Sequence, residues 1–257
     1  MSEYQYYDFY AIDKPLTQEQ IAVISTFSSR THPTPRRATF EYNYGDFSYN
    51  QEEVVSTYFD MMLYVANWGS RQLLMKFPID LVPFKTLQKY QINASDFAAQ
   101  EIRVFKKEKH VFINLEMNLD EGDWIEGEGL LDGLLPLREQ ILLGDHRVLY
   151  LAWKYLDAQK LSSKGAGGVH ISKTPPIPPN MGKIDASLQE FISFWELDAD
   201  LVDSAIKESP VEEPIPEEVL ISLIKELPNE EKDRILSILL KDRQRAQIEL
   251  KNHLKAL

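Results

Sequence analysis

The fold is decided by one stretch of the sequence, His110-Val111-Phe112-Ile113-Asn114-Leu115-Glu116-Met117. Its odd-numbered residues are aliphatic or Met, and they alternate with residues that include Asn114 and Glu116. This period of two is typical of a β-strand. A second strand is predicted just before it, at Phe97–Lys106, because Lys107-Glu108-Lys109 is short enough for a hairpin turn.

Three further strands are predicted towards the N-terminus, at Glu3–Tyr10, Ala38–Tyr44 and Arg71–Phe77. Helical patterns lie between them without the regular spacing of a doubly wound sheet. The sequence therefore predicts an α+β fold, in which an N-terminal mixed sheet with helices is followed by an all-helical C-terminal part.

Two helices are predicted inside the N-terminal part. The first is short and begins at Thr17, which stands three residues before Gln20 in the spacing of a capping box. The second is predicted to run from about Gln51 to Trp68, because Asn50 suits an N-cap and a wide apolar face follows. Gly69 suits its end.

The rest of the chain is predicted to be helical apart from one linker. Two helices, at Leu134–Leu143 and Asp145–Lys160, close a first domain of residues 1–160. Residues 161–184 are rich in Pro and Gly and are predicted to be a linker. An acidic helical region, residues 185–257, follows, with helices expected at Ala186–Trp195, Ala199–Lys207, Pro216–Leu227 and Asn229–Ala256.

Composition narrows the class of protein. The 257 residues carry a formal net charge of −12 and no cysteine, which argues against broad nucleic-acid binding and excludes thiol chemistry. The N-terminus has no basic segment followed by an apolar run, and the apolar runs are too short to span a membrane. We therefore expect a cytoplasmic protein, and nothing in the sequence indicates a cofactor.

Candidate catalytic residues are few. Asp46, Asp60, Asn67 and Trp68 are polar or aromatic residues at a glycine turn and along a predicted helix end, where they could line one pocket. The alternative is that Asp46 is a turn residue and Asn67 a helix-end residue. No sequence signature of an enzyme supports the first interpretation.

A metal site is not indicated by any ligand spacing. Asp120, Glu121 and Asp123 are the first residues of a dense acidic connector that could hold Mg²⁺ or Ca²⁺. Their spacing does not fit a calcium loop, and a solvated acidic loop is the better interpretation.

Nucleic-acid binding is an alternative function. The predicted N-terminal strands are rich in Tyr and Phe, and Arg36, Arg37, Lys106 and Lys107 lie near them. An aromatic sheet face rimmed by cations can stack single-stranded bases. The competing interpretation, which the acidic balance favours, is that the rings are ordinary packing residues.

The last helices indicate a protein partner. Val219, Leu220, Leu223 and Ile224 make an apolar face on one helix, and Ile235, Leu236, Leu239 and Leu240 make one on the next. Amphipathic helices beyond a linker can grip another protein, or they can fold back on the front part. Both arrangements remain open at this stage.

Several stretches resemble a family of uncharacterised bacterial proteins. They are Glu3-Tyr4-Gln5-Tyr6-Tyr7-Asp8-Phe9 with Ala11-Ile12-Asp13-Lys14-Pro15-Leu16-Thr17, Tyr44-Gly45-Asp46-Phe47, Tyr58-Phe59-Asp60 through Ala66-Asn67-Trp68-Gly69, and Leu227-Pro228 with Glu231-Lys232. The resemblance spans most of the chain and brings no established activity or catalytic residue. It implies a partner among SWIM-type zinc-finger proteins, beside which such proteins are encoded.

The sequence thus leaves three functions in order of preference. The first is a non-enzymatic interaction or adaptor protein that uses its C-terminal helices. The second is a nucleic-acid-associated factor, and the third is an enzyme whose site is assembled from residues distant in the sequence.

Overall fold

The computed structural model describes residues 3–93, 100–119, 125–163, 173–213 and 215–256. These residues form one sheet, whose neighbouring strands all pair antiparallel in the order β2-β1-β3-β4-β6-β5. The strands are β1 (Gln5–Tyr10), β2 (Arg37–Tyr42), β3 (Met61–Ala66), β4 (Ser70–Pro78), β5 (Glu101–Lys107) and β6 (His110–Asn118). The predicted α+β class is confirmed.

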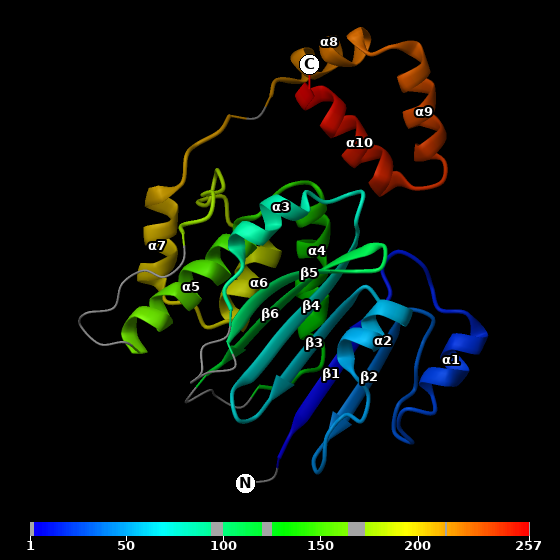
Figure 1. The fold of residues 1–257 in the computed structure, drawn as a ribbon, viewed down its shortest axis with the longest axis vertical. Helices are drawn as coiled ribbons and strands as arrows, with labels where there is room; N and C mark the ends of the chain where they lie inside the picture. The colour runs from blue at the N-terminus through cyan, green and yellow to red at the C-terminus, as the bar shows by residue number, and fades with distance from the viewer. Residues whose placement is uncertain (1–2, 94–99, 120–124, 164–172, 214, 257) are drawn as a thin grey trace.

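Helices cover both faces of the sheet (Figure 1). On one face lie α1 (Gln18–Ile24) and α2 (Gln51–Tyr58). On the other lie α4 (Leu130–Leu142), α5 (Arg147–Ser163) and α6 (Ala186–Phe194). The remaining helical elements are α3 (Phe84–Leu87), the 3-10 turn η1 (Gln88–Tyr90), α7 (Ala199–Glu208), α8 (Glu217–Glu226), α9 (Asn229–Leu239) and α10 (Arg243–Ala256).

Local sequence signals explain several element ends. The capping box at α1 is present, since Thr17 Oγ1 accepts from the Gln20 backbone N–H and the Gln20 side chain accepts from that of Thr17. The predicted hairpin between β5 and β6 is also present, with Glu108 in the left-handed region at φ 53°. These ends follow from local hydrogen bonding, which a sequence displays directly.

The helix predicted over 51–68 is wrong. Its first half is α2, but Met61–Ala66 is β3, which pairs with β1 on one side and β4 on the other. Met61, Leu63 and Val65 face the helices α4 to α6, and Met62 packs into the core on the α2 side. A strand buried on both faces is apolar throughout, so its sequence lacks the alternation that identifies a strand.

The C-terminal half divides differently from its sequence pattern. Leu188, Phe191, Phe194 and Trp195 enter the core between the sheet and α4, so α6 belongs to the front part of the molecule. The single helix predicted over 229–256 is two helices, α9 and α10, separated by a turn at Leu240–Asp242. In Figure 1, α8, α9 and α10 form a separate group above the end of the sheet.

The predicted linker is only partly visible in the described residues. Its first residues continue α5, and residues 164–172 lie outside the described ranges. The part from 173 onwards packs on the protein, since Pro176 O accepts from the Tyr90 hydroxyl at 2.8 Å and Met181 is buried. This part is therefore extended and attached along the core.

Candidate functional site

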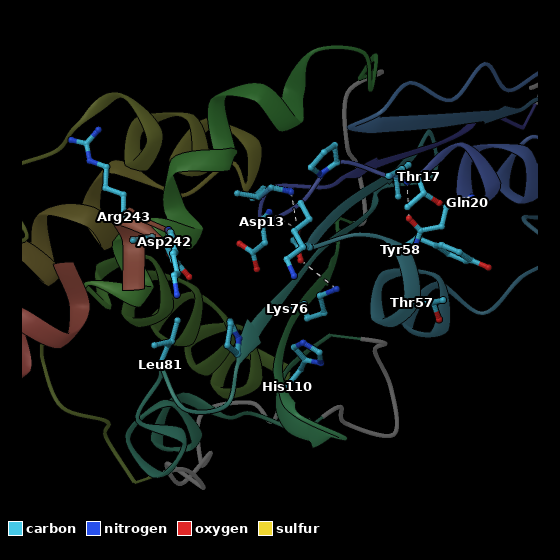
Figure 2. Close-up of a pocket in the computed structure, with 18 residues that line it drawn as sticks. Asp13, Thr17, Gln20, Thr57, Tyr58, Lys76, Leu81, His110, Asp242 and Arg243 are labelled. Atoms are coloured by element: carbon cyan, nitrogen blue, oxygen red, sulfur yellow. Dashed lines mark hydrogen bonds and ion pairs between the residues drawn. The ribbon is translucent and has the colours of Figure 1, made fainter. Parts of the chain in front are cut away.

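A pocket of about 830 Å³ opens at the end of the sheet where β1 and β4 finish (Figure 2). Its walls come from the connection after β1 (residues 12–17), the end of α2 (57–58), Asp60, the end of β4 and the start of β6. Residues 241–244, which are the end of the α9–α10 turn and the first residues of α10, complete them. The pocket therefore lies between the sheet and the C-terminal helices. Its size is within the usual range for small-molecule sites.

Asp60 organises one wall of the pocket. Its buried carboxylate accepts hydrogen bonds from the backbone N–H groups of Ile12 at 2.7 Å and Asp13 at 2.8 Å. The second carboxylate oxygen lies 3.3 Å from Lys76 Nζ. Asp60 thus fixes the chain as it leaves β1, because a buried carboxylate is stable only with such partners.

Lys76 is a buried cation at the end of β4. Besides Asp60, its ammonium donates to Val55 O at 3.1 Å and to Ser56 O at 3.5 Å. All three acceptors lie at or just beyond the last turn of α2, where helix carbonyls favour a cation. Lys76 therefore joins the end of α2 to the sheet beneath it.

Arg138, on α4, lies behind the pocket wall and holds Asp13, which lines the pocket. Its guanidinium donates two hydrogen bonds of 2.8 Å to the carboxylate of Asp13, and its Nε donates to Lys76 O at 2.7 Å. Arg138 is only 1% exposed, and it lies over the Phe77 ring at 5.5 Å. This two-pronged geometry suits Arg and holds Asp13 in one orientation.

His110 is the only histidine among the described residues that line the pocket. Burial and the nearby Lys76 charge lower its pKa, against the opposing effects of Asp60, Glu108 and Asp13. Its Nδ1 is buried without a hydrogen-bond partner. Figure 2 shows Asp13, Lys76 and His110 around the same hollow.

Of the four candidate catalytic residues, only Asp60 lies in this pocket. Asp46 accepts from Gln5 Nε2 at 2.8 Å, and Asn67 Oδ1 accepts from the Tyr4 backbone N–H at 3.0 Å. Trp68 donates from Nε1 to Ser70 Oγ at 2.9 Å. These three lie near the start of β1, whereas Asp60 lies beyond its end, so the structure does not bring the four together.

The four candidate nucleic-acid residues lie at opposite edges of the sheet. Arg36 and Arg37 are at β2, and Lys106 and Lys107 are in β5, which are the two outermost strands. Arg36 donates to Ala11 O and Ile12 O. The other three make ion pairs or a ring contact: Arg37 with Asp8 and Asp132, Lys107 with Glu53, and Lys106 over Phe84.

Within the described residues, most aromatic side chains of β1 and β2 are packed inside the protein and are not displayed on an open face. Tyr4, Tyr6, Tyr7, Phe9 and Phe40 are all buried. They pack in the two cores on either side of the sheet. The arrangement of rings and cations therefore gives no support to base stacking on this sheet.

Metal binding finds no support in the described residues. Asp120, Glu121 and Asp123 lie outside the described ranges. Within those ranges, no group of three or more His, Asp or Glu side chains is placed to hold a metal ion. No helix within the described residues is both long and apolar enough to cross a membrane.

Sequence reasoning missed Lys76, Arg138 and His110. A signal existed for two of them. Lys76 stands inside the apolar strand Leu73–Phe77, and Arg138 lies on the same helix face as Leu134 and Ile141. A charged residue on an apolar face is buried only with partners, and those partners are distant in the sequence.

We compared the chain with protein-family models, with curated protein sequences and with solved structures, and none of the three comparisons found a match.

Proposed function

We propose that the protein is a non-enzymatic adaptor that holds another protein on its C-terminal helices. The observation that carries this proposal is the exposure of aliphatic side chains on α8 and α9. They are Val219, Ile221, Ile224, Leu236 and Leu239, with Leu240 directly after α9. Leu240 is 89% exposed and Leu236 is 58% exposed.

Such exposure is costly without a partner. Covering one Leu or Ile side chain contributes about 1.5–3 kcal/mol. Helices of ten or eleven residues are also marginal in water unless packing stabilises them. None of the described residues of α8 is buried, so a partner that covers α8 and α9 would supply much of their stability.

The excess of acidic residues around α8 and α9 indicates the charge that a partner surface should carry. Residues 211–239 hold the acids Glu212, Glu213, Glu217, Glu218, Glu226, Glu230, Glu231 and Asp233 and the bases Lys225, Lys232 and Arg234. A complementary partner presents an apolar helix face flanked by Lys and Arg. The resemblance to uncharacterised bacterial proteins makes a SWIM-type zinc-finger protein the first partner to test, in the cytoplasm of a bacterium.

The test measures affinity for the SWIM-type zinc-finger protein encoded beside this chain. We expect the double variant Leu236→Gln, Leu240→Gln to bind it about tenfold more weakly or worse, because central apolar contacts dominate such interfaces. A matched control replaces the exposed aliphatic residues Val23 and Ile184 by Gln, and these lie outside α8 to α10. Isothermal titration calorimetry with the full chain gives both affinities.

Equal binding by the wild-type chain and the α9 variant would contradict the proposal, as would a lack of binding by the wild-type chain. A second copy of this chain could also cover the exposed face of α8 and α9, and light scattering on the purified chain tests for such a dimer. A dimer that the α9 variant abolishes would replace the proposed partner by self-association.

A further inference from the structure

The pocket at the end of β1 and β4 has its acidic groups already occupied. Asp60 accepts from two backbone N–H groups and pairs with Lys76. Asp13 is held by Arg138 through two hydrogen bonds. Asp242 caps α10 by accepting from the Arg245 backbone N–H at 2.9 Å. Each lining carboxylate therefore has protein donors already bound to it.

The groups that remain unused are mostly donors. Within the described residues, the side chains of Lys14, Lys241 and Arg243 make no hydrogen bond or ion pair, although all three line the pocket. The ring of His110 lines the same pocket. A ligand that pairs with these three cations must supply acceptor atoms.

The charge of the pocket points the same way. The cations Lys14, Lys76, Lys241 and Arg243, with Arg138 behind them, outnumber the carboxylates of Asp13, Asp60 and Asp242. The whole chain has a net charge of −12, so this is a locally positive site on an acidic protein. A concave site lined by one sign of charge concentrates ligands of the opposite sign.

From this balance of donors and charge, we propose that the pocket binds a small metabolite carrying a phosphate or carboxylate group. The anion lies between His110 and the free ammonium groups of Lys14 and Lys241. The volume of about 830 Å³ leaves room for the rest of such a molecule. The inference goes beyond the proposed adaptor function and does not depend on it.

The position of the pocket gives the ligand a structural consequence. One wall is formed by residues 241–244, at the end of the α9–α10 turn and the start of α10, and another is the connection after β1. A bound anion contacts both walls and therefore favours the docked position of the C-terminal helices. Ligand binding stabilises only the state in which both walls are in place.

The experiment titrates the full-length chain with inorganic phosphate and, separately, with citrate, at constant ionic strength. Imidazole NMR signals report on the pocket, with the His110 signal assigned through His110→Gln. We expect a saturable shift of the His110 signal at millimolar anion. The variant Lys14→Glu, Lys241→Glu is expected to bind about tenfold more weakly or worse, because two attractive charges become repulsive.

The matched control is Lys89→Glu, Lys207→Glu, which changes the net charge equally at two exposed lysines away from the pocket. It is expected to bind as the wild-type chain does. Response to phosphate alone, to citrate alone or to both supports the proposal and identifies the group that is recognised.

Two results would overturn the inference. One is the absence of a saturable His110 shift with either anion. The other is equal binding by the pocket variant and its control, which would indicate an adventitious ion only. The adaptor variant Leu236→Gln, Leu240→Gln is expected to bind the anion normally, so failure of one proposal is distinguishable from failure of the other.

Discussion

Lys76 and Arg138 are buried cations in a largely apolar core, and they are neighbours, since Arg138 Nε donates to Lys76 O. Each is fully engaged, Lys76 by Asp60 and two carbonyls, and Arg138 by Asp13 and Lys76 O. Buried charges of this kind contribute little net stability, but removing one partner is strongly destabilising. They therefore fix the positions of Asp60 and Asp13, two carboxylates that line the pocket, before any ligand arrives.

His110 gives the protein a pH dependence of stability. Burial, with the Lys76 charge, lowers the pKa of its imidazole below the ordinary value of 6.5, and Asp60, Glu108 and Asp13 only partly oppose this. The folded chain then binds the proton less readily than the unfolded chain. This contribution is fully present above about pH 6.5 and is lost as the pH falls below it.

We therefore expect His110→Gln to reduce the loss of unfolding free energy between pH 7 and pH 5. The difference is expected to be below about 1 kcal/mol, because the ring is half-buried and water screens part of the effect. Urea denaturation at several pH values measures it. The variant His32→Gln, at an exposed position, is the control, and an equal effect of both substitutions would refute the assignment to His110.

At the scale of elements, the β3–β4 hairpin depends on Gly69. Its φ of +94° lies in the left-handed region, and an added Cβ would lie 1.9 Å from Leu119 O. Gly45 has a similar φ of +80° but open space around it. The two glycines therefore separate backbone strain from steric overlap.

We expect Gly45→Ala to cost about 1 kcal/mol of unfolding free energy, from backbone strain alone. Gly69→Ala is expected to cost about 3 kcal/mol or more, because the turn must also move away from Leu119. Urea denaturation of both variants measures the difference. Equal costs would mean that the hairpin relaxes without resistance from the neighbouring backbone.

Two hairpins of the sheet show where prediction from sequence succeeds and where it fails. The strands β5 and β6 were predictable because β6 alternates, with Asn114 and Glu116 between aliphatic residues. Strand β3 was not, since Met61–Ala66 is buried on both faces and its run of apolar residues continues that of α2. Periodicity does not separate a doubly buried strand from a buried helix.

The pocket was largely unpredictable for a different reason. Asp60 was among the candidate residues, but its partners Ile12, Asp13 and Lys76 are 16 or more positions away in the sequence. The wall at residues 241–244 is more distant still. Such contacts depend on strand order, and no local pattern in a single sequence encodes it.

At the scale of the whole molecule, α8 to α10 are attached by few contacts. Their own core consists mainly of Leu227, Ile235 and Ala246. Ile248 of α10 enters the main core, and Arg245 pairs with Asp80 at 2.5 Å. Lys251 also donates to Leu143 O. Because these contacts are few, we expect the C-terminal helices to open without unfolding of the sheet.

Hydrogen exchange tests this division with the variant Ile248→Ala. Removing a buried Ile side chain costs about 2–5 kcal/mol, and here the loss falls on the docking of α10. We expect amides of α8, α9 and α10 to exchange faster in the variant, while those of β3, β4 and β6 keep their wild-type protection.

Leu239→Ala is the control, because this side chain is 47% exposed and lies on α9 rather than in the main core. If the sheet and the C-terminal helices lost protection together in Ile248→Ala, the chain would be one cooperative unit. The helices could then not respond separately to a partner or to an anion in the pocket.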